Sequence, residues 1–196
     1  GMIEEAGLQA GQWLLLTAGA SAFGKFAIQM AKAKGIRVAA TVRHESQKEL
    51  LLDLGAELVI NTSTEKLAKV IFEKTEVGVD VVFDAVGGEL GVKALSCLKQ
   101  KGRMLVFGAL ALENLSINSG LLIFKNLRIE GFWLSTWIEE LSAEQRMKAF
   151  QRVFGFLMQD ESKVDVAATY PLAEFKAALD AYEKAGRNGK ILLVSE

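Results

Sequence analysis

The chain has 196 residues, of which 51% are hydrophobic and 24% are charged, a size and composition that predict one packed globular domain and exclude a disordered protein. Its net charge of −1, with acidic and basic residues interspersed, excludes a strong electrostatic site for nucleic acid or an anionic membrane and favours a small-molecule substrate or a protein as partner. A single cysteine, Cys97, excludes an internal disulfide framework, and no apolar run approaches the roughly 20 residues that span a bilayer, so we expect a cytoplasmic protein without a membrane partner.

The first part of the chain has the pattern of a strand, a tight turn and a helix. Residues 13–17 are continuously apolar, which is typical of a buried parallel strand, and residues 18–24 are mostly small. Apolar residues then recur at helical spacing, at Phe23, Phe26, Ala27, Met30 and Ala31. Gly35 marks the expected end of this helix, and residues 37–42 are predicted to form a second buried strand. The segment is therefore predicted to be a βαβ unit.

The same alternation continues along the chain. Further helices are expected at residues 46–54, 65–75 and 90–99, and further strands at residues 57–61, 79–85 and 103–108. Strands that alternate with helices of this length are typical of an α/β protein with a doubly wound parallel sheet, the Rossmann fold, in which helices cover both faces of the sheet in three layers. We assign residues 1–163 to this domain.

The last third of the chain changes in character. An aromatic-rich segment contains the expected last strand of the sheet at residues 127–132, and an amphipathic helix is expected at residues 143–159. A strand, a helix and a strand then follow beyond the six-stranded core, at residues 164–171, 173–185 and 190–194. Residues 164–196 are therefore predicted to form a separate C-terminal segment.

The bend after the first strand, Gly19-Ala20-Ser21-Ala22-Phe23-Gly24, approaches the pattern G-x-G-x-x-G. In a Rossmann turn the backbone N–H groups and the helix dipole meet the pyrophosphate of a dinucleotide. The first and third glycines are present, but Ser21 occupies the middle position, where a Cβ must not block the phosphates. The position of the bend between a buried strand and a helix favours dinucleotide binding, and a purely structural tight turn is the alternative.

The residue at the end of the second strand discriminates between cofactors. NAD-binding proteins place an acidic residue there, about 20 residues after the turn, and its carboxylate accepts hydrogen bonds from the ribose hydroxyls. This chain has Arg43, nineteen residues after Gly24, and a guanidinium there favours the 2′-phosphate of NADPH over NADH. Two alternatives stay open: Arg43 is a surface residue paired with Glu45, or Glu45 itself accepts from a ribose hydroxyl of NAD. Methyl transfer from S-adenosylmethionine is disfavoured, because it would also require an acidic residue at this position.

The sequence contains no convincing acid–base catalyst. His44 is the only histidine and lies beside Arg43, and together with Cys97 it cannot supply the three or four ligands of a zinc site, so no metal is expected. Cys97 is interpreted as a small core residue. Neither Tyr170 nor Tyr182 is followed four residues later by lysine, and no serine-hydrolase triad is assembled. We therefore predict no catalytic residue in this chain.

Several segments together resemble one family. They are AGLQAGQW at residues 6–13, TAGASAFGKFAIQMA at 17–31, LGAELVI at 54–60, FDAVGG at 83–88 and GRMLVFG at 102–108. These segments resemble the zinc-free, quinone-reductase-like branch of the medium-chain dehydrogenase/reductase superfamily. Residues 122–134, LIFKNLRIEGFWL, together with Trp137, are most similar to the mitochondrial-type trans-2-enoyl thioester reductases.

The resemblance implies a nicotinamide cofactor across the carboxyl edge of the sheet. The residues implied at the pyrophosphate are Ala20, Ser21, Ala22, Phe23 and Gly24, and those implied around the adenosine phosphate are Arg43, His44 and Glu45. The residues implied at the nicotinamide end are Phe107, Gly108, Ala109 and Leu110 at its ribose, Phe132, Trp133 and Leu134 at its carboxamide, and Lys190 from the returning C-terminal segment. Ala22 and Phe23 depart from the glycine and valine usual in the family. The alternative for residues 132–137 is a set of ordinary core aromatics.

The resemblance also implies what the chain would do. Its relatives begin with a barrel-like catalytic domain that carries the proton-donating tyrosine, and residues 164–196 would return to that domain, which this chain lacks. The implied activity is hydride transfer from NADPH to an activated alkene, such as a 2-enoyl thioester, or to a quinone, with the isolated chain catalytically incomplete. The alternative is a non-catalytic NADPH-binding or interaction module. A homodimer is expected through the edge strand at residues 127–132, as in relatives.

Overall fold

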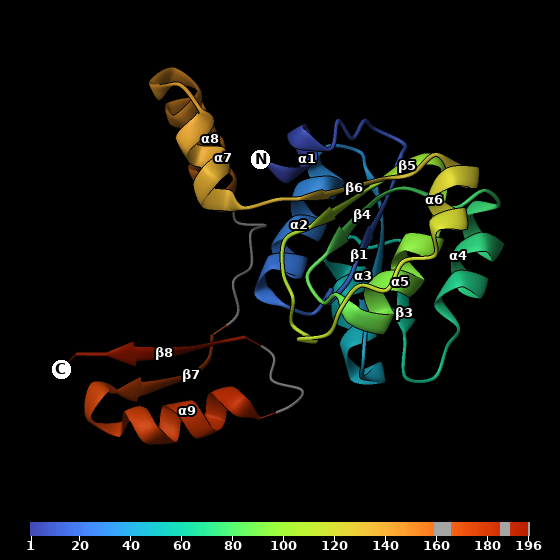
Figure 1. Ribbon diagram of the computed structural model, residues 1–196. Coiled ribbons are helices and arrows are strands. Elements are labelled where there is room, and N and C mark those ends of the chain that lie inside the picture. The colour runs from blue at the N-terminus through green and yellow to red at the C-terminus, as the bar shows by residue number, and fades with distance from the viewer. Residues whose placement is uncertain (159–165, 185–188, 196) are drawn as a thin grey trace.

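The computed structural model describes residues 1–158, 166–184 and 189–195. Six parallel strands form one sheet in the order β3-β2-β1-β4-β5-β6 (Figure 1). Their bounds are Trp13–Leu16 for β1, Arg37–Val42 for β2, Leu58–Asn61 for β3, Val79–Asp84 for β4, Leu98–Val106 for β5 and Arg128–Gly131 for β6. The chain proceeds outward from β1 in one direction to β3, then returns and proceeds in the other direction to β6. This is the predicted doubly wound Rossmann sheet.

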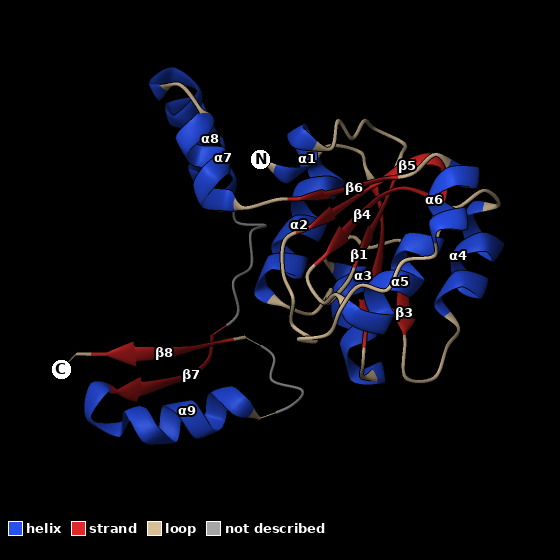
Figure 2. Ribbon diagram, viewed as in Figure 1, coloured by secondary structure: helices blue, strands red, loops and turns tan. Residues whose placement is uncertain are grey.

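Helices cover both faces of this sheet (Figure 2). The helices of this part of the chain are α1 (Met2–Glu5), α2 (Ala22–Ala33), α3 (Lys48–Asp53), α4 (Leu67–Thr75), α5 (Gly88–Ser96), α6 (Ser119–Lys125), α7 (Leu134–Glu140) and α8 (Ala143–Leu157), with a 3₁₀ turn at Glu45–Gln47. Helices α7 and α8 extend away from the sheet (Figure 1). The alternation of side chains along β1 separates the two cores: Leu14 and Leu16 pack on the side of α2 and α3, and Leu15 packs on the side of α4 and α5. Because both faces of the central strands are buried, these strands are mostly apolar.

The C-terminal segment forms a small unit of its own. Strands β7 (Val166–Pro171) and β8 (Lys190–Val194) pair in parallel, joined through a 3₁₀ turn at Leu172–Glu174 and helix α9 (Phe175–Glu183). The main contacts of these elements are with one another. The predicted strand–helix–strand order is confirmed, while residues 159, 164, 165 and 185 of the predicted elements lie outside the described part of the chain.

Several element boundaries differ from the sequence-based predictions. Helix α5 ends at Ser96, because Leu98 pairs with Val79 at the start of β5, whereas the helical pattern was expected to continue to residue 99. Helices α6 and α7 were not predicted. Each has seven residues, which is too short for a clear helical periodicity.

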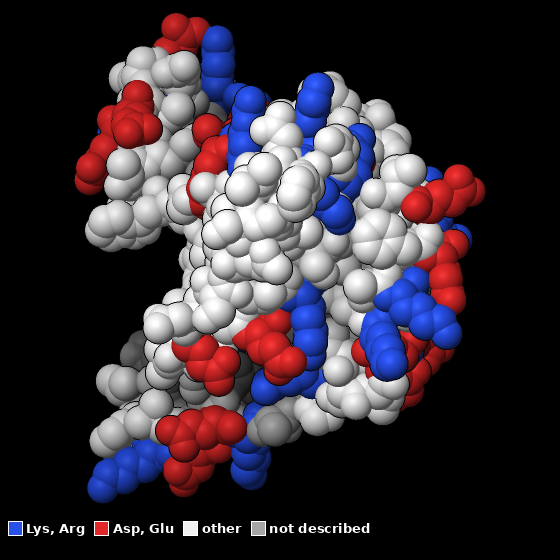
Figure 3. Space-filling model, turned by 45° about the vertical axis from the view of Figure 1, so that its right-hand side comes forward, with Lys and Arg blue, Asp and Glu red and all other residues white. Residues whose placement is uncertain are grey.

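Charged side chains of both signs are interspersed on the face shown in Figure 3, without a continuous basic patch. None of the described helices combines the length and the apolar character needed to cross a bilayer.

Candidate functional site

The turn between β1 and α2 lies at the carboxyl end of the sheet. It is held by its neighbours on both sides, since the amide of Thr17 donates to the carbonyl of Phe83 in β4 at 3.1 Å and the amide of Gly19 donates to the carbonyl of Thr41 in β2 at 2.8 Å. The order of strands reverses between β1 and β4. In doubly wound sheets such a reversal point opens the crevice in which ligands bind.

Steric constraints explain the two glycines of this turn. A Cβ at Gly24 would lie 2.3 Å from the carbonyl oxygen of Gly19, and a Cβ at Gly19 would lie 2.7 Å from the Cβ of Ala40. Both distances are shorter than real Cβ contacts, so only glycine fits at either position. The close approach of strand and helix therefore depends on the two glycines that match the motif.

Ser21, at the motif's middle position, is the N-cap of α2. Its Oγ accepts a hydrogen bond from the amide of Gly24 at 3.0 Å, so the hydroxyl is turned toward its own helix. Within the described part of the chain, the amides of Ala22 and Phe23 have no hydrogen-bond partner. These two donors stand at the positive end of the helix dipole and can bind an anion there.

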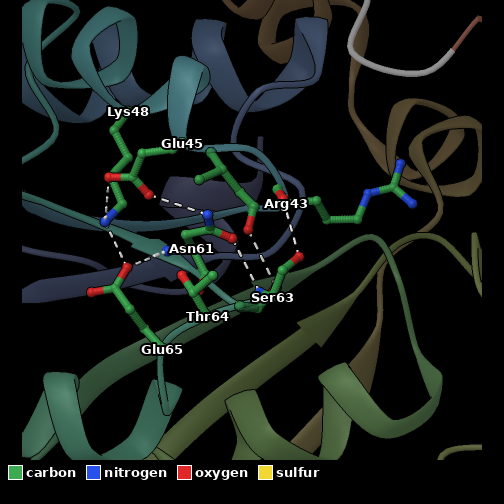
Figure 4. Close-up of polar contacts among 9 residues, drawn as sticks. Arg43, Glu45, Lys48, Asn61, Ser63, Thr64 and Glu65 are labelled. Atoms are coloured by element: carbon green, nitrogen blue, oxygen red, sulfur yellow. Dashed lines mark hydrogen bonds and ion pairs between the residues drawn. The ribbon is translucent and has the colours of Figure 1, made fainter.

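Arg43 directly follows β2, and its side chain extends away from the neighbouring polar groups (Figure 4). No described residue pairs with its guanidinium, and His44 beside it is exposed. Glu45 is instead bound by Lys48, at 3.2 Å, and by the side-chain amide of Asn61, at 3.1 Å. The alternative in which Glu45 pairs with Arg43 is therefore not the arrangement in this structure.

Three polar residues of this region were not identified from the sequence. The ammonium of Lys48 lies 2.6 Å from the carboxylate of Glu65, which also accepts from the amide of Asn61 at 2.8 Å. These contacts raise the pKa of Lys48 and hold the pKa of Glu65 below its ordinary value, in both cases chiefly through the Lys48–Glu65 hydrogen bond. The polar run that directly follows β3 was a signal for Glu65, whereas Asn61 is the last residue of β3 and Lys48 is the first residue of α3.

The segment after β5 lies against the end of β4. The amide of Phe107 donates to the carbonyl of Asp84 at 2.9 Å, and a Cβ at Gly108 would lie 2.6 Å from the carbonyl oxygen of Ala85. The ring of Phe107 lies 4.5 Å from the ring of Phe23, between centroids. The fold thus brings the phosphate-turn residue Phe23 together with the segment that the resemblance implies at the nicotinamide ribose.

A cavity of about 660 Å³ joins this segment to the end of β6. It is lined by Phe107, Gly108 and Ala109 on one side and by Phe132 and Trp133 on the other. A neighbouring cavity of about 870 Å³ shares Phe107, Phe132 and Trp133 and adds Phe23 and Leu134. Phe132 packs against the core, but Trp133 is 74% exposed, so the interpretation of this segment as core aromatics holds for Phe132 and not for Trp133.

Two implied residues lie elsewhere. Leu110 is exposed beyond the first cavity. Lys190 lies on β8 in the C-terminal unit, which Figure 1 shows apart from the six-stranded sheet. Within the described part of the chain, the main contacts of β8 are with β7 and α9.

The described residues offer neither a metal site nor an activated thiol. No group of three or more His, Cys, Asp or Glu side chains among them is arranged to hold a metal ion. Cys97 is buried, as predicted, and burial raises the pKa of its thiol to about 11. The thiol is therefore protonated near neutral pH.

Comparison with known proteins agrees with this geometry. A family model described as "Zinc-binding dehydrogenase" matches residues 22–151. The mitochondrial enoyl-[acyl-carrier-protein] reductase of Dictyostelium discoideum is 28% identical over 193 residues, which cover 95% of this chain and 54% of that protein. Prostaglandin reductase 1 of Bos taurus is 28% identical over 200 residues, which cover 98% of this chain and 60% of that protein. The structure of Escherichia coli quinone oxidoreductase complexed with NADPH matches with a TM-score of 0.85 and 30% identity. The match covers 95% of this chain and 58% of that chain.

The chain thus spans between about half and three fifths of the length of these curated relatives. The family match extends over more than half of the chain, from the first turn of α2 into α8. The resemblance that the motifs indicated is confirmed. Although the family name refers to zinc, the described residues do not fit a zinc site. The chain belongs to the zinc-binding dehydrogenase family, within the medium-chain dehydrogenase/reductase superfamily.

Proposed function

We propose that this chain is the NADPH-binding domain of a zinc-independent oxidoreductase that transfers hydride to an activated alkene, such as a 2-enoyl thioester, or to a quinone. The observation that carries the proposal is a pair of anion-binding features at one sheet edge. Among the described residues, no partner binds the amides of Ala22 and Phe23 at the start of α2 or the guanidinium of Arg43 at the end of the adjacent β2. A dinucleotide with a 2′-phosphate carries negative charge at both places.

The turn supplies the pyrophosphate site. Two amides at a helix N-terminus donate hydrogen bonds to phosphate oxygens, and the helix dipole adds a favourable field. Ser21 does not compete for this space, because its hydroxyl is directed to Gly24. In this proposal Ala20 and Gly24 complete the close backbone approach to the phosphates.

Arg43 selects NADPH. A charge-assisted contact between a guanidinium and a phosphate contributes about 1.5–3 kcal/mol, enough for a preference of about tenfold or more over NADH. Glu45 does not neutralise Arg43, because its carboxylate is bound by Lys48 and Asn61. His44 completes the adenosine end of the proposed site.

The nicotinamide would lie in the cavity between the two segments that follow β5 and β6, where it would supply the hydride. Phe107, Gly108, Ala109 and Leu110 would line its ribose, and Phe132, Trp133 and Leu134 would hold its carboxamide. The aromatic side chains of Phe107, Phe132 and Trp133, which both cavities share, would shield part of the reacting face from water. Lys190 would reach the cofactor only if the C-terminal unit lies closer to the sheet in the complete enzyme.

The names of the relatives support the substrate class, since they include an enoyl reductase and a quinone oxidoreductase. We assign residues 1–163 to cofactor binding and residues 164–196 to contact with a catalytic domain that supplies the proton donor. The chain by itself would then bind NADPH and turn over enoyl thioesters or quinones poorly. A non-catalytic NADPH-binding module is the second candidate, and we propose the cytoplasm as the compartment.

A homodimer would form through β6, which is one of the two edge strands of the sheet. Ile123 and Phe124 on the adjacent α6 are both exposed. Pairing of two edge strands would cover the unpaired backbone groups of β6 together with these apolar side chains.

Calorimetric titration of the chain with NADPH and with NADH tests the proposed function. The wild-type chain should bind NADPH about tenfold or more tightly than NADH, and Arg43→Gln should abolish most of that preference. Arg37→Gln is the matched control, because Arg37 lies at the opposite end of β2 and is paired with Glu57 at 2.9 Å. Failure to bind either nucleotide would overturn the cofactor site. Equal affinity of the wild type for both would overturn the assignment of NADPH alone.

Assays with an enoyl thioester and with a quinone, with and without an added catalytic domain from a relative, separate the enzyme from the binding module. Activity that appears only with the added domain supports the enzyme. Normal turnover by the chain alone would contradict its catalytic incompleteness.

A further inference from the structure

Glu45 is a potential obstacle to a phosphate at the end of β2. It follows Arg43 by two residues, and its side chain is 68% exposed. A free carboxylate there would repel the adenosine 2′-phosphate of NADPH and could accept a hydrogen bond from the ribose 2′-hydroxyl of NADH. Whether this site prefers NADPH therefore depends on where the carboxylate of Glu45 is held.

Both oxygens of this carboxylate are bound on the side away from Arg43 (Figure 4). Oε1 lies 3.2 Å from the ammonium of Lys48, and Oε2 accepts from the side-chain amide of Asn61 at 3.1 Å. We propose that Lys48 and Asn61 are positioning residues for cofactor specificity, which hold Glu45 away from the adenosine ribose and so make the end of β2 selective for NADPH. This inference rests on the proposed function.

The two positioning residues are anchored independently of Glu45. Asn61 is the last residue of β3 and is only 4% exposed, and its side-chain oxygen accepts from the amide of Ser63 at 3.1 Å. Lys48 is bound by Glu65 at 2.6 Å, and its side chain is only 22% exposed. Both side chains are therefore held by contacts with the end of β3 and the residues that follow it, in addition to the contacts that each makes with Glu45.

The same network also ties the two loops together. The hydroxyl of Ser63 donates to the backbone carbonyl of Arg43 at 3.0 Å, and that of Thr62 donates to the carbonyl of Val42 at 3.2 Å. The backbone from which Arg43 extends is thus fixed by the same segment that restrains Glu45. One cluster of hydrogen bonds therefore fixes the backbone that carries Arg43 and holds the carboxylate of Glu45 away from the proposed phosphate site.

Removal of the Lys48 ammonium should release Glu45. In Lys48→Met the carboxylates of Glu45 and Glu65 lose the cation that lies between them, and like charges then favour an outward position of the exposed Glu45. We expect the preference for NADPH over NADH to fall about two- to fivefold, the range typical of exposed charge pairs. NADPH should bind more weakly, while NADH should bind equally or more tightly.

The decisive comparison is a double-mutant cycle in which the dissociation constants of both cofactors are measured for wild type, Lys48→Met, Glu45→Gln and the double variant. If Lys48 acts through Glu45, Glu45→Gln in the Lys48→Met background should return the preference close to the wild-type value. Lys93→Met is the matched control, since Lys93 forms a similar pair with Glu89 at 2.8 Å on α5, and it should leave the preference unchanged. Circular dichroism verifies that each variant is folded.

Two results would overturn the inference while leaving the proposed function intact. One is an equal loss of affinity for both cofactors in Lys48→Met, which indicates a structural role only. The other is a double variant that stays as weak for NADPH as Lys48→Met, which indicates that Lys48 contacts the phosphate itself. A wild-type chain that binds neither cofactor would instead refute the proposed function.

Discussion

The hydroxyl of Thr17, directly after β1, donates a 2.7 Å hydrogen bond to Oδ1 of Asp84, the wholly buried last residue of β4. The same hydroxyl accepts from the amide of Ala85 at 2.9 Å, and the carboxylate also accepts from the amides of Val86 and Gly87, both at 3.0 Å. This pair joins the ends of the two strands that flank the reversal point of the sheet. It fixes the crevice on which the cofactor proposal depends.

Asp84→Ala should therefore be strongly destabilising. The substitution leaves one hydroxyl and two amides unsatisfied in a buried site, and we expect a loss of about 3 kcal/mol or more. Urea unfolding measures this loss. Asp53→Ala, at an exposed position of α3, is the control and should leave the midpoint close to that of the wild type. A small effect of Asp84→Ala would show that these groups find other partners.

Gly24→Ala should disrupt the phosphate turn, because the added Cβ would contact the carbonyl oxygen of Gly19 at 2.3 Å. Relief of such a contact by backbone movement costs about 1–3 kcal/mol, and the moved turn should no longer bind NADPH. Gly155→Ala is a matched substitution in α8, where the added Cβ would meet no atom within 4 Å. It should stabilise the chain by up to about 1 kcal/mol without a change in NADPH affinity. Unaltered binding by Gly24→Ala would refute the role of this turn.

Ser21→Ala separates capping from cofactor contact. Loss of the N-cap hydroxyl should cost about 1 kcal/mol of unfolding free energy, whereas NADPH affinity should change little, because the hydroxyl is directed to Gly24. Ser142→Ala removes the corresponding cap of α8, where Oγ accepts from the amide of Gln145 at 3.2 Å, and should cost a similar amount. Thermal melting and calorimetric titration measure the two effects. A tenfold loss of affinity in Ser21→Ala alone would mean that the hydroxyl contacts the phosphate.

The Lys48–Glu65 pair predicts a pH dependence of stability. The hydrogen bond that Glu65 accepts from Lys48, and after it the one from the backbone amide of Asn61, lower the pKa of Glu65 in the folded state. A lowered pKa stabilises the fold above the unfolded value, about 4.3, and this contribution is lost as the pH falls through the folded value. The raised pKa of Lys48 has no effect in this range, because its contribution is complete below the lysine value of about 10.4.

The difference in urea midpoint between wild type and Glu65→Gln should thus have its full size at pH 7 and shrink progressively as the pH falls below the unfolded value of about 4.3. A difference that stays constant over this range would mean that the ionised carboxylate does not stabilise the fold.

The sequence by itself determined the fold class and the place of the turn. Mostly apolar strands such as residues 13–17 could be recognised because both faces of a central parallel strand are buried, and Gly19 and Gly24 could be recognised because only glycine fits between strand and helix. The position of Arg43, nineteen residues after Gly24 at the end of the second strand, then led to the prediction that it reads the cofactor. Each of these signals lies within one continuous stretch of chain.

Only the tertiary structure decided which side chains meet. The Thr17–Asp84 hydrogen bond joins residues 67 positions apart, and Asn61 reaches Glu45 across 16 positions. The early end of α5 depends likewise on the pairing of Leu98 with Val79. Periodicity reports how a residue is buried, because burial follows from its own local geometry. It does not report the partner, because that partner is set by strand order and register, which bring distant parts of the chain to the same edge of the sheet.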